Sequence, residues 1–215
     1  MKKILSIVLI ATLVLFSAIS VCADDTSDEF EDVIRFGIMQ GDENGDMNFE
    51  ALTTRAEMAQ IVVNAAGLSG VDAANIPTEG FSDVGENHWA YNAIMLAQSV
   101  GYINGNGDGT FAPDDNVTYG QMLKMAVTLL GYEPIAEQRG GYPEGYVAVA
   151  KQIGLTDGIQ FKIDDYAVRY DVAAIMEKAL NTPIMEQISY GSEAEYRISD
   201  GKDGGELVTL KNNLE

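Results

Sequence analysis

The sequence repeats itself, and this feature constrains the fold more than any other. At an offset of 64 residues, without a gap, two stretches of the chain coincide. The matched pairs are Gly37 and Gly101, Gly41 and Gly105, Gly45 and Gly109, Thr54 and Thr118, Met58 and Met122, and Gly67 and Gly131. A third copy begins 53 residues after the second and then loses three loop residues, so that Arg169 falls opposite Arg55. Self-similarity of this kind indicates stacked units, and we predict three of them.

Each unit has the pattern of two helices joined by a glycine-rich loop. In the second unit, apolar residues from Ala90 to Val100 recur at spacings of three and four, which predicts a helix that Asn87 caps and Gly101 ends. A capping box then opens the second helix; it spans Thr54 to Glu57 in the first unit and Thr118 to Gln121 in the second. Since no single pair can bury its apolar stripe, we expect three pairs to stack around a shared axis.

The second unit resembles the S-layer homology (SLH) motif. The residues that carry the resemblance are Phe81-Ser-Asp-Val84, His88-Trp-Ala90, Gly101-Tyr-Ile-Asn-Gly105, Asp108-Gly-Thr-Phe111, Pro113-Asp114 and Val117-Thr118. In the first unit, Leu52-Thr-Thr-Arg-Ala-Glu57 is similar to the family's signature, whereas the outer units are divergent elsewhere. The resemblance spans roughly residues 28–182 and implies a mainly α fold, with three helix-loop-helix repeats in a pseudo-threefold prism.

The expected boundaries follow from the repeat. They are a signal peptide at 1–23, SLH repeats at 24–69, 78–133 and 140–183, and a β-rich tail at 186–215. In the tail, Tyr190-Gly-Ser, Tyr196-Arg-Ile and Glu206 to Leu210 suggest two short strands around a turn that begins at Asp200. Two strands rarely stand alone, so we interpret the tail as the beginning of a truncated domain or as a segment that pairs with a partner.

The first residues are typical of a secretory signal. Lys2 and Lys3 precede an apolar stretch, and Ala23 is followed by acidic residues, which predicts cleavage after Ala23. A membrane-spanning helix and a lipidated Cys22 are the weaker alternatives, because the stretch is short and a valine precedes the cysteine. We therefore expect a secreted protein, and the resemblance to the SLH family implies a place at the cell surface or cell wall (S-layer). Export without disulfides suits a monoderm bacterium.

The charge balance excludes several partners. The chain has 33 acidic residues against 13 basic ones, and cleavage would leave 11 basic residues and a net charge of about −22. Such a chain is a poor match for nucleic acid or for anionic lipid, which attract clustered Lys and Arg. Without Cys22 the chain has no cysteine, and one histidine cannot replace a cysteine-based zinc site. We expect no metal and no cofactor.

The resemblance also implies a site. In the SLH family, grooves between repeats bind secondary cell-wall polysaccharide, which often carries acidic pyruvyl groups. The matching residues of this chain, the candidate glycan-binding residues, are Gly41, Arg55, Glu57, Trp89, Gly105, Arg169 and Asp171. For Trp89, stacking on a sugar and anchoring the core remain equally open.

The position of Arg55 has its own chemistry. A cation in the first turn of a helix opposes the macrodipole, but a bound carboxylate would accept from both the guanidinium and the exposed backbone N–H groups there. The alternative is a surface ion pair, worth about 0 to 1 kcal/mol. The second unit has Tyr119 and Gly120 at the positions of Arg55 and Ala56. One groove is therefore expected to lack its anion contact, which leaves one or two working grooves.

Other functions have weaker support. Asp42 to Asn48 resembles the start of a calcium loop, but Met47 replaces the glycine of the bend and Thr53 replaces the closing glutamate. A repeat loop is the simpler interpretation. A protein–protein module, self-association and an anchor for a C-terminal effector remain open. The sequence has no nucleophile elbow, phosphate loop or metal-spaced histidines, and carboxylates alone carry little information, so we predict no enzyme activity and no catalytic residue.

Overall fold

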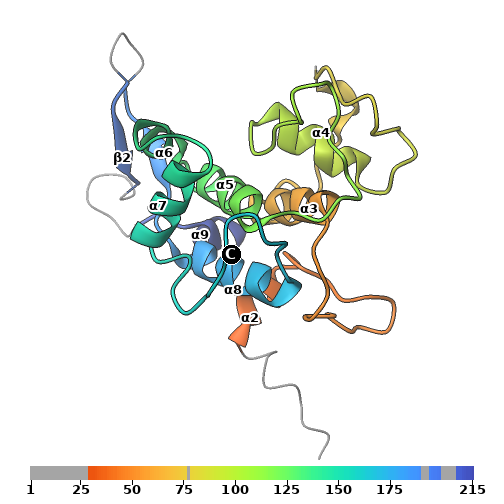
Figure 1. The fold of residues 1–215 in the computed structure, drawn as a ribbon, viewed down its shortest axis with the longest axis horizontal. Coiled ribbons are helices and arrows are strands. Elements are labelled where there is room, and N and C mark those ends of the chain that lie inside the picture. Colours follow the sequence, from red (N-terminus) through yellow and green to blue (C-terminus); the bar gives the residue numbers. More distant parts are fainter. Residues whose placement is uncertain (1–28, 77, 190–193, 200–206) are drawn as a thin grey trace, which may run out of the picture.

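The protein is mainly helical, as the sequence predicts, with one short sheet near its C-terminus (Figure 1). A computed structural model describes residues 29–76, 78–189, 194–199 and 207–215. The elements are α2 (Glu31–Arg35), α3 (Arg55–Ala65), η1 (Ala73–Asn75), α4 (Tyr91–Ser99), α5 (Tyr119–Leu129), α6 (Glu133–Gln138), α7 (Glu144–Gln152), α8 (Arg169–Asn181), β1 (Met185–Gln187), β2 (Tyr196–Ile198) and α9 (Leu210–Leu214). The signal peptide predicted at 1–23 lies outside the described residues. Within them, no helix combines the length and the apolar character needed to cross a bilayer.

Three extended segments, one before each of the helices α3, α5 and α8, meet in a closed ring. The N–H of Thr53 donates to the carbonyl of Ala167 (3.0 Å), that of Ala167 to Val117 (2.9 Å), and that of Val117 to Thr53 (2.9 Å). All three residues are fully buried. This cyclic order joins the start of each long helix to the other two, and it places the three predicted units around one axis.

The helices interlock in the same order. The first helix of one unit packs on the second helix of the preceding unit: α4 lies on α3, α7 on α5, and α2 on α8. Their apolar faces form one core, in which Ile94, Leu123 and Met176 are among the fully buried side chains. Each such side chain stabilises the fold by about 1.5–3 kcal/mol. No unit completes its own core, so every surface groove between units is built from more than one of them.

The helix starts agree in part with the sequence. The capping boxes at Thr54 with Glu57 and at Thr118 with Gln121 are confirmed, since each threonine side chain accepts from the backbone of the residue three positions on, and that side chain bonds back. Val168 precedes α8 without a side-chain cap. These caps fix where the long helices begin and therefore where their first side chains point.

The cap predicted at Asn87 is wrong. Helix α4 begins at Tyr91 and its N-cap residue, Ala90, has no side-chain cap. The reason is a local turn, because the imidazole Nδ1 of His88 accepts from the N–H of Ala90 at 3.1 Å and occupies the last turn before the helix. His88 therefore shapes the entry into α4.

The strands of the C-terminal segment differ from the predicted ones. β1 pairs antiparallel with β2, so the run at Tyr196 is confirmed as a strand. The run at Tyr190 to Ser192 and the turn from Asp200 lie outside the described residues. The strand predicted up to Leu210 is wrong at its described end, because Thr209 caps α9 in a capping box with Asn212 and only bridges Pro183.

The described part of this segment packs against the helical body. The N–H of Met185 donates to the carbonyl of Leu130 at the end of α5 (2.8 Å), and Leu210 is buried. Helix α9 lies beside α8 (Figure 1), and Lys211 pairs with Asp32 of α2. The segment thus covers the end of the bundle opposite the ring.

Candidate functional site

The N-terminus of α3 has no free backbone donors in its first turn, contrary to the expectation for an anion site. The N–H of Arg55 donates to the carbonyl of Asp115 (2.8 Å) and that of Ala56 to the carbonyl of Pro113 (2.9 Å). The next N–H bonds to the hydroxyl of Thr54. The cyclic pairing of the extended segments causes this, so recognition has to come from side chains.

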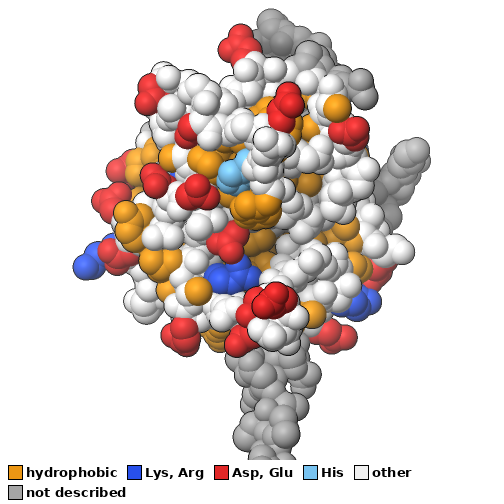
Figure 2. Space-filling view, turned by 90° about the vertical axis from the view of Figure 1, so that its right-hand side faces the viewer, with side chains coloured by type: hydrophobic (Ala, Val, Ile, Leu, Met, Phe, Trp, Pro, Cys, Tyr) orange, Lys and Arg blue, Asp and Glu red, His pale blue; other side chains and the backbone are white. Residues whose placement is uncertain are grey.

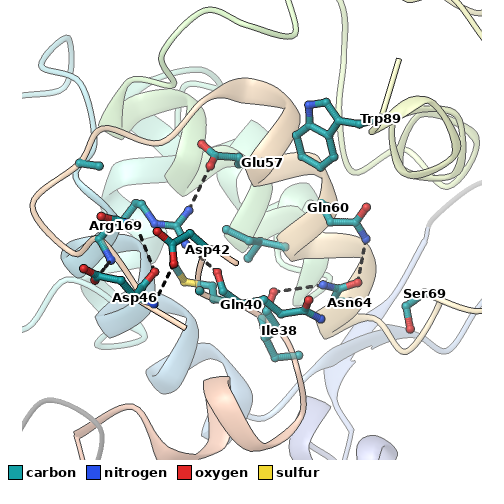
Figure 3. A pocket seen from close by; sticks show the side chains of 15 residues that line it. Ile38, Gln40, Asp42, Asp46, Glu57, Gln60, Asn64, Ser69, Trp89 and Arg169 are labelled. Carbon is teal, nitrogen blue, oxygen red and sulfur yellow. Dashed lines mark hydrogen bonds and ion pairs between the residues drawn. The ribbon is translucent and has the colours of Figure 1, made fainter. Parts of the chain in front are cut away.

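Two grooves between the units contain candidate residues. Groove A is a hollow of about 640 Å³ that contains four of the candidate residues, Gly41, Glu57, Trp89 and Arg169. Its complete lining is Ile38, Met39, Gln40, Gly41, Asp42, Asp46, Asn48, Ala51, Glu57, Gln60, Ile61, Asn64, Ser69, Trp89 and Arg169. The loop and α3 come from the first unit, the tryptophan from the second and the arginine from the third (Figure 3).

Arg169 is a fixed part of groove A. It is 9% exposed, and its Nε donates to the carbonyl of Met47 (2.9 Å). Its Nη2 donates to the carbonyl of Gln40 (3.1 Å) and its Nη1 to Glu57 Oε1 (3.2 Å). The ion pair with Glu57 balances its charge, and the two carbonyl contacts tie the first unit's loop to α8. The guanidinium therefore holds the loop and α3 of the first unit against α8 at the bottom of the groove.

The opposite wall of groove A presents an aromatic ring. Trp89 is 62% exposed, stacks on His88 with a centroid separation of 5.8 Å, and lies across the groove from Arg169 (Figure 3). Such exposure does not fit an anchor of the core. On the same side as Trp89 lies Gln60, whose amide donates to Asn64 Oδ1 (2.8 Å) (Figure 3). An indole face with neighbouring amides and carboxylates offers both apolar contact and hydrogen bonds to a polyhydroxylated ligand.

Groove B, a smaller hollow of about 190 Å³, is lined mainly by the second unit, with Arg55 from the first unit and Tyr142 from the third. It contains the candidate residues Arg55 and Gly105, and its lining is Arg55, Tyr102, Ile103, Asn104, Gly105, Asn106, Gln121, Lys124, Met125 and Tyr142. Arg55 and Glu57, two positions apart on α3, thus lie in different grooves. The helix turns their side chains toward different neighbours.

Arg55 is held by backbone and by a ring. It is 5% exposed, its Nε donates to the carbonyl of Phe111 (2.7 Å), and its Nη2 reaches the carbonyl of Asn104 (3.4 Å). The guanidinium also lies 4.5 Å from the centroid of the Phe111 ring. Burial lowers the pKa of Arg55, which nonetheless stays protonated at neutral pH. No carboxylate belongs to the described lining of groove B.

A second cation lies in groove B. Lys124 Nζ is 5.8 Å from the ring centroid of Tyr142 and 5.7 Å from that of Tyr146. With the Asn104 amide oriented so that its nitrogen donates to the carbonyl of Ile103, the amide oxygen accepts from Lys124 Nζ at 2.8 Å. Aromatic faces and an amide oxygen thus position the ammonium group.

The third interface has a tyrosine in place of an arginine, and a further hollow of about 230 Å³, with Phe30 and Gly158 in its lining, lies between the first and third units. Tyr119 occupies the place of the arginines, stacks on Phe161 at 5.0 Å, and donates its hydroxyl to Asp171. Burial, and then this bond, raise the pKa of Tyr119. Asp171, a candidate residue, therefore lies apart from the other six and contacts Tyr119 as Glu57 contacts Arg169.

Sequence reasoning missed Tyr142 and Lys124. The signal for Tyr142 was present, because it falls 53 residues after Trp89, the offset that relates the second and third units. Lys124 gave no signal on its own, since one lysine on a helix is unremarkable until its neighbours are known.

The acidic loop of groove A is shaped by its own backbone. Asp42 Oδ1 accepts from the N–H groups of Asn44 (2.8 Å) and Asp46 (3.0 Å), and these bonds lower the pKa of Asp42. Across the described part of the chain, no three His, Cys, Asp or Glu side chains converge as metal ligands would. These contacts account for the resemblance to a calcium loop through turn formation.

Comparison with known proteins identifies relatives. The S-layer homology domain family matches residues 80–123. A surface layer protein of Brevibacillus choshinensis is 29% identical over 213 residues, covering 93% of this chain and 19% of that protein. A cell surface protein of Thermoanaerobacter kivui is 32% identical over 136 residues, covering 63% of this chain and 17% of that protein.

An endoglucanase of a Bacillus species is also similar, with 34% identity over 79 residues that cover 37% of this chain and 8% of that enzyme. The chain spans less than a fifth of the length of each of the curated relatives named above. The match at residues 80–123 identifies an S-layer homology domain in the second unit, and the similarity over most of the chain is to proteins of the bacterial cell surface.

Proposed function

We propose that this chain attaches a secreted protein non-covalently to the bacterial cell wall by binding secondary cell-wall polysaccharide in grooves A and B. In this proposal residues 24–69, 78–133 and 140–183 are three SLH repeats, and the chain is an anchor without catalytic activity. The carried cargo lies in the longer polypeptide or in a partner.

The observation that carries the proposal is the convergence of residues from all three units in groove A. Trp89, Glu57 and Arg169 are far apart in the sequence, yet they line one hollow large enough for several sugar rings. The exposed indole supplies an apolar face for the C–H side of a sugar, and Glu57 with Gln60 supplies hydrogen-bonding groups for hydroxyls. A folding role alone does not explain an exposed tryptophan beside a buried arginine.

Groove B supports the same function, because it also has an aromatic side chain and an arginine at equivalent positions. Tyr142 takes the place of Trp89 by the 53-residue offset, and Arg55 takes the place of Arg169. The third interface has Tyr119 bonded to Asp171 in place of an arginine. We therefore propose two working grooves, and a polymer that carries acidic groups such as pyruvyl ketals as the ligand.

Sedimentation with isolated cell-wall sacculi tests the function. The purified chain should pellet with intact sacculi and stay in solution with sacculi stripped of secondary polysaccharide. A Trp89→Ala, Tyr142→Ala double variant should lose at least tenfold in affinity. Tyr166→Ala is the matched control, because Tyr166 is equally exposed and lines neither groove. Equal binding to stripped sacculi, or full binding by the double variant, would refute the proposal.

A further inference from the structure

Grooves A and B are built from equivalent elements of the repeat, but the charges of their lining side chains have opposite signs. One cation and three carboxylates line groove A, namely Arg169 with Asp42, Asp46 and Glu57. Two cations and no carboxylate line groove B among the residues that the structure describes. Because the two grooves are related by the repeat, the difference can be traced to single positions.

The 64-residue offset pairs the linings position by position. Each acidic residue of groove A has a neutral counterpart in the second unit, and the neutral amide of Gln60 has a cation as its counterpart. The pairs are Asp42 with Asn106, Asp46 with Thr110, Glu57 with Gln121, and Gln60 with Lys124. Three of these pairs, all except Asp46 with Thr110, line both grooves, and all three differences make groove B more positive than groove A. In a chain with a formal net charge of −20, a hollow with two cations is unusual.

The cations of groove B are also available to a ligand. The Nε and Nη2 of Arg55 donate to backbone carbonyls, and within the described part of the chain its Nη1 has no hydrogen-bond partner. Asp83 and Asp115 act on Arg55 electrostatically but lie outside the lining. The carboxylate of Asp83 is occupied by the N–H groups of Phe111 (2.8 Å) and Ala112 (2.7 Å).

Lys124 is equally unpaired. Among the described residues it forms no ion pair, and its contacts are two tyrosine rings and an amide oxygen. Such contacts orient an ammonium group without neutralising it. In groove A the corresponding charge is absent and Arg169 is already paired with Glu57. An anion entering groove A would meet three carboxylates, whereas one entering groove B would meet two positive groups.

We propose that Lys124 is a specificity-determining residue which, together with Arg55, makes groove B select an anionic substituent of the polysaccharide, while groove A takes an uncharged segment. This inference rests on the proposed function. The anionic group is a carboxylate or a phosphate ester, whose oxygens fit both cations. The family resemblance treats Arg55 and Arg169 alike, and the structure separates them.

Calorimetry with soluble fragments of wall polysaccharide tests the inference. Short fragments prevent one molecule from bridging both grooves. Three preparations are compared on the full chain: native, carboxyl-reduced and dephosphorylated. Trp89 is the one tryptophan of the chain and lines groove A, so its fluorescence reports groove A separately in each titration.

We expect one class of sites to lose at least tenfold in affinity with one of the two modified preparations, and that preparation identifies the anion. Lys124→Gln, which introduces the residue found at position 60, should reduce the preference for native over modified fragments by a similar factor. Lys162→Gln removes the same charge from an exposed position outside both grooves and should change nothing. Gln60→Lys should give the Trp89 signal a new preference for native fragments.

The outcomes separate the two proposals. If no fragment binds the unmodified chain, the proposed function fails. If all three preparations bind the unmodified chain equally, or if Lys124→Gln keeps the full preference while its thermal unfolding is normal, the function stands and the role of Lys124 is refuted.

Discussion

Grooves A and B differ in what their arginines do. In groove A, Arg169 is saturated by two carbonyls and Glu57, so it joins two units and carries little free charge. In groove B, Arg55 faces Gln121 in place of a glutamate and keeps one nitrogen free within the described residues. The comparison teaches that equivalent residues of a repeat protein can have different functions when a single facing residue changes.

The largest expected effect is on stability. Arg169→Met removes a nearly buried cation from a carboxylate and two carbonyls, and should lower the free energy of unfolding by about 3 kcal/mol. Arg55→Met leaves two carbonyls but no carboxylate unpaired, and should cost about 1–2 kcal/mol. Urea denaturation of both variants measures the difference. Equal losses would mean that the two arginines have the same structural role.

The glycine at the floor of each groove offers a second, local test. An added Cβ at Gly41 would lie 2.7 Å from the carbonyl carbon of Gly45, and one at Gly105 would lie 2.6 Å from the carbonyl oxygen of Thr110. Each alanine substitution should cost about 1–3 kcal/mol through displaced backbone. Gly41→Ala should abolish the Trp89 fluorescence response and leave the preference for native fragments. Gly105→Ala should abolish the preference for native fragments and leave the Trp89 fluorescence response. A variant of either glycine that impairs both readouts equally would contradict the distinction between the two grooves.

The C-terminal segment offers a variant that should spare both grooves. A Cβ at Gly131 would lie 2.1 Å from the carbonyl oxygen of Met185, whereas one at Gly101 meets nothing within 4 Å. Both glycines have a φ near +80°, so alanine carries the same backbone strain at each. Gly131→Ala should therefore lower the free energy of unfolding by about 1–2 kcal/mol more than Gly101→Ala does, because it displaces the docked segment at Met185. Thermal unfolding and polysaccharide titration of the two variants check this, and a changed groove affinity in Gly131→Ala alone would contradict it.

The smallest expected effect concerns the ring that both grooves share. Thr53 is fully buried, and its hydroxyl has no hydrogen-bond partner among the described residues. Thr53→Val introduces the residue that the second unit has at Val117, and removing an unsatisfied buried hydroxyl should stabilise the fold by about 0.5–1 kcal/mol. Differential scanning calorimetry measures this. A destabilised variant would indicate a buried water on the hydroxyl.

Much of the architecture could be predicted because the same pattern of apolar, capping and glycine residues recurs in the repeated units. The offset aligned the capping threonines Thr54 and Thr118, which fix where two of the long helices begin. The strand expected near Leu210 failed because the choice between strand and helix there depends on the capping box of Thr209 and on docking against the bundle. Local pattern does not report tertiary docking.

The site was harder to predict than the fold. Alignment of units groups Arg55 with Glu57 because both lie in one helix turn, but the cyclic packing sends them into different grooves. The cyclic packing also brings Asp171 into a hydrogen bond with Tyr119, so that Asp171 lines neither groove A nor groove B. Which unit faces which is a property of the assembled ring, so a residue's groove cannot be read from its own unit.

The most direct test of the central claim is a fluorescence titration of Trp89 with soluble wall polysaccharide. Because this side chain is exposed in groove A and the chain has no other tryptophan, a saturable change in its emission at the concentrations where the chain binds sacculi is the expected result. Carboxyl-reduced and dephosphorylated fragments should produce the same change. Unaltered emission from a chain that nonetheless sediments with intact sacculi would contradict groove A as a polysaccharide site.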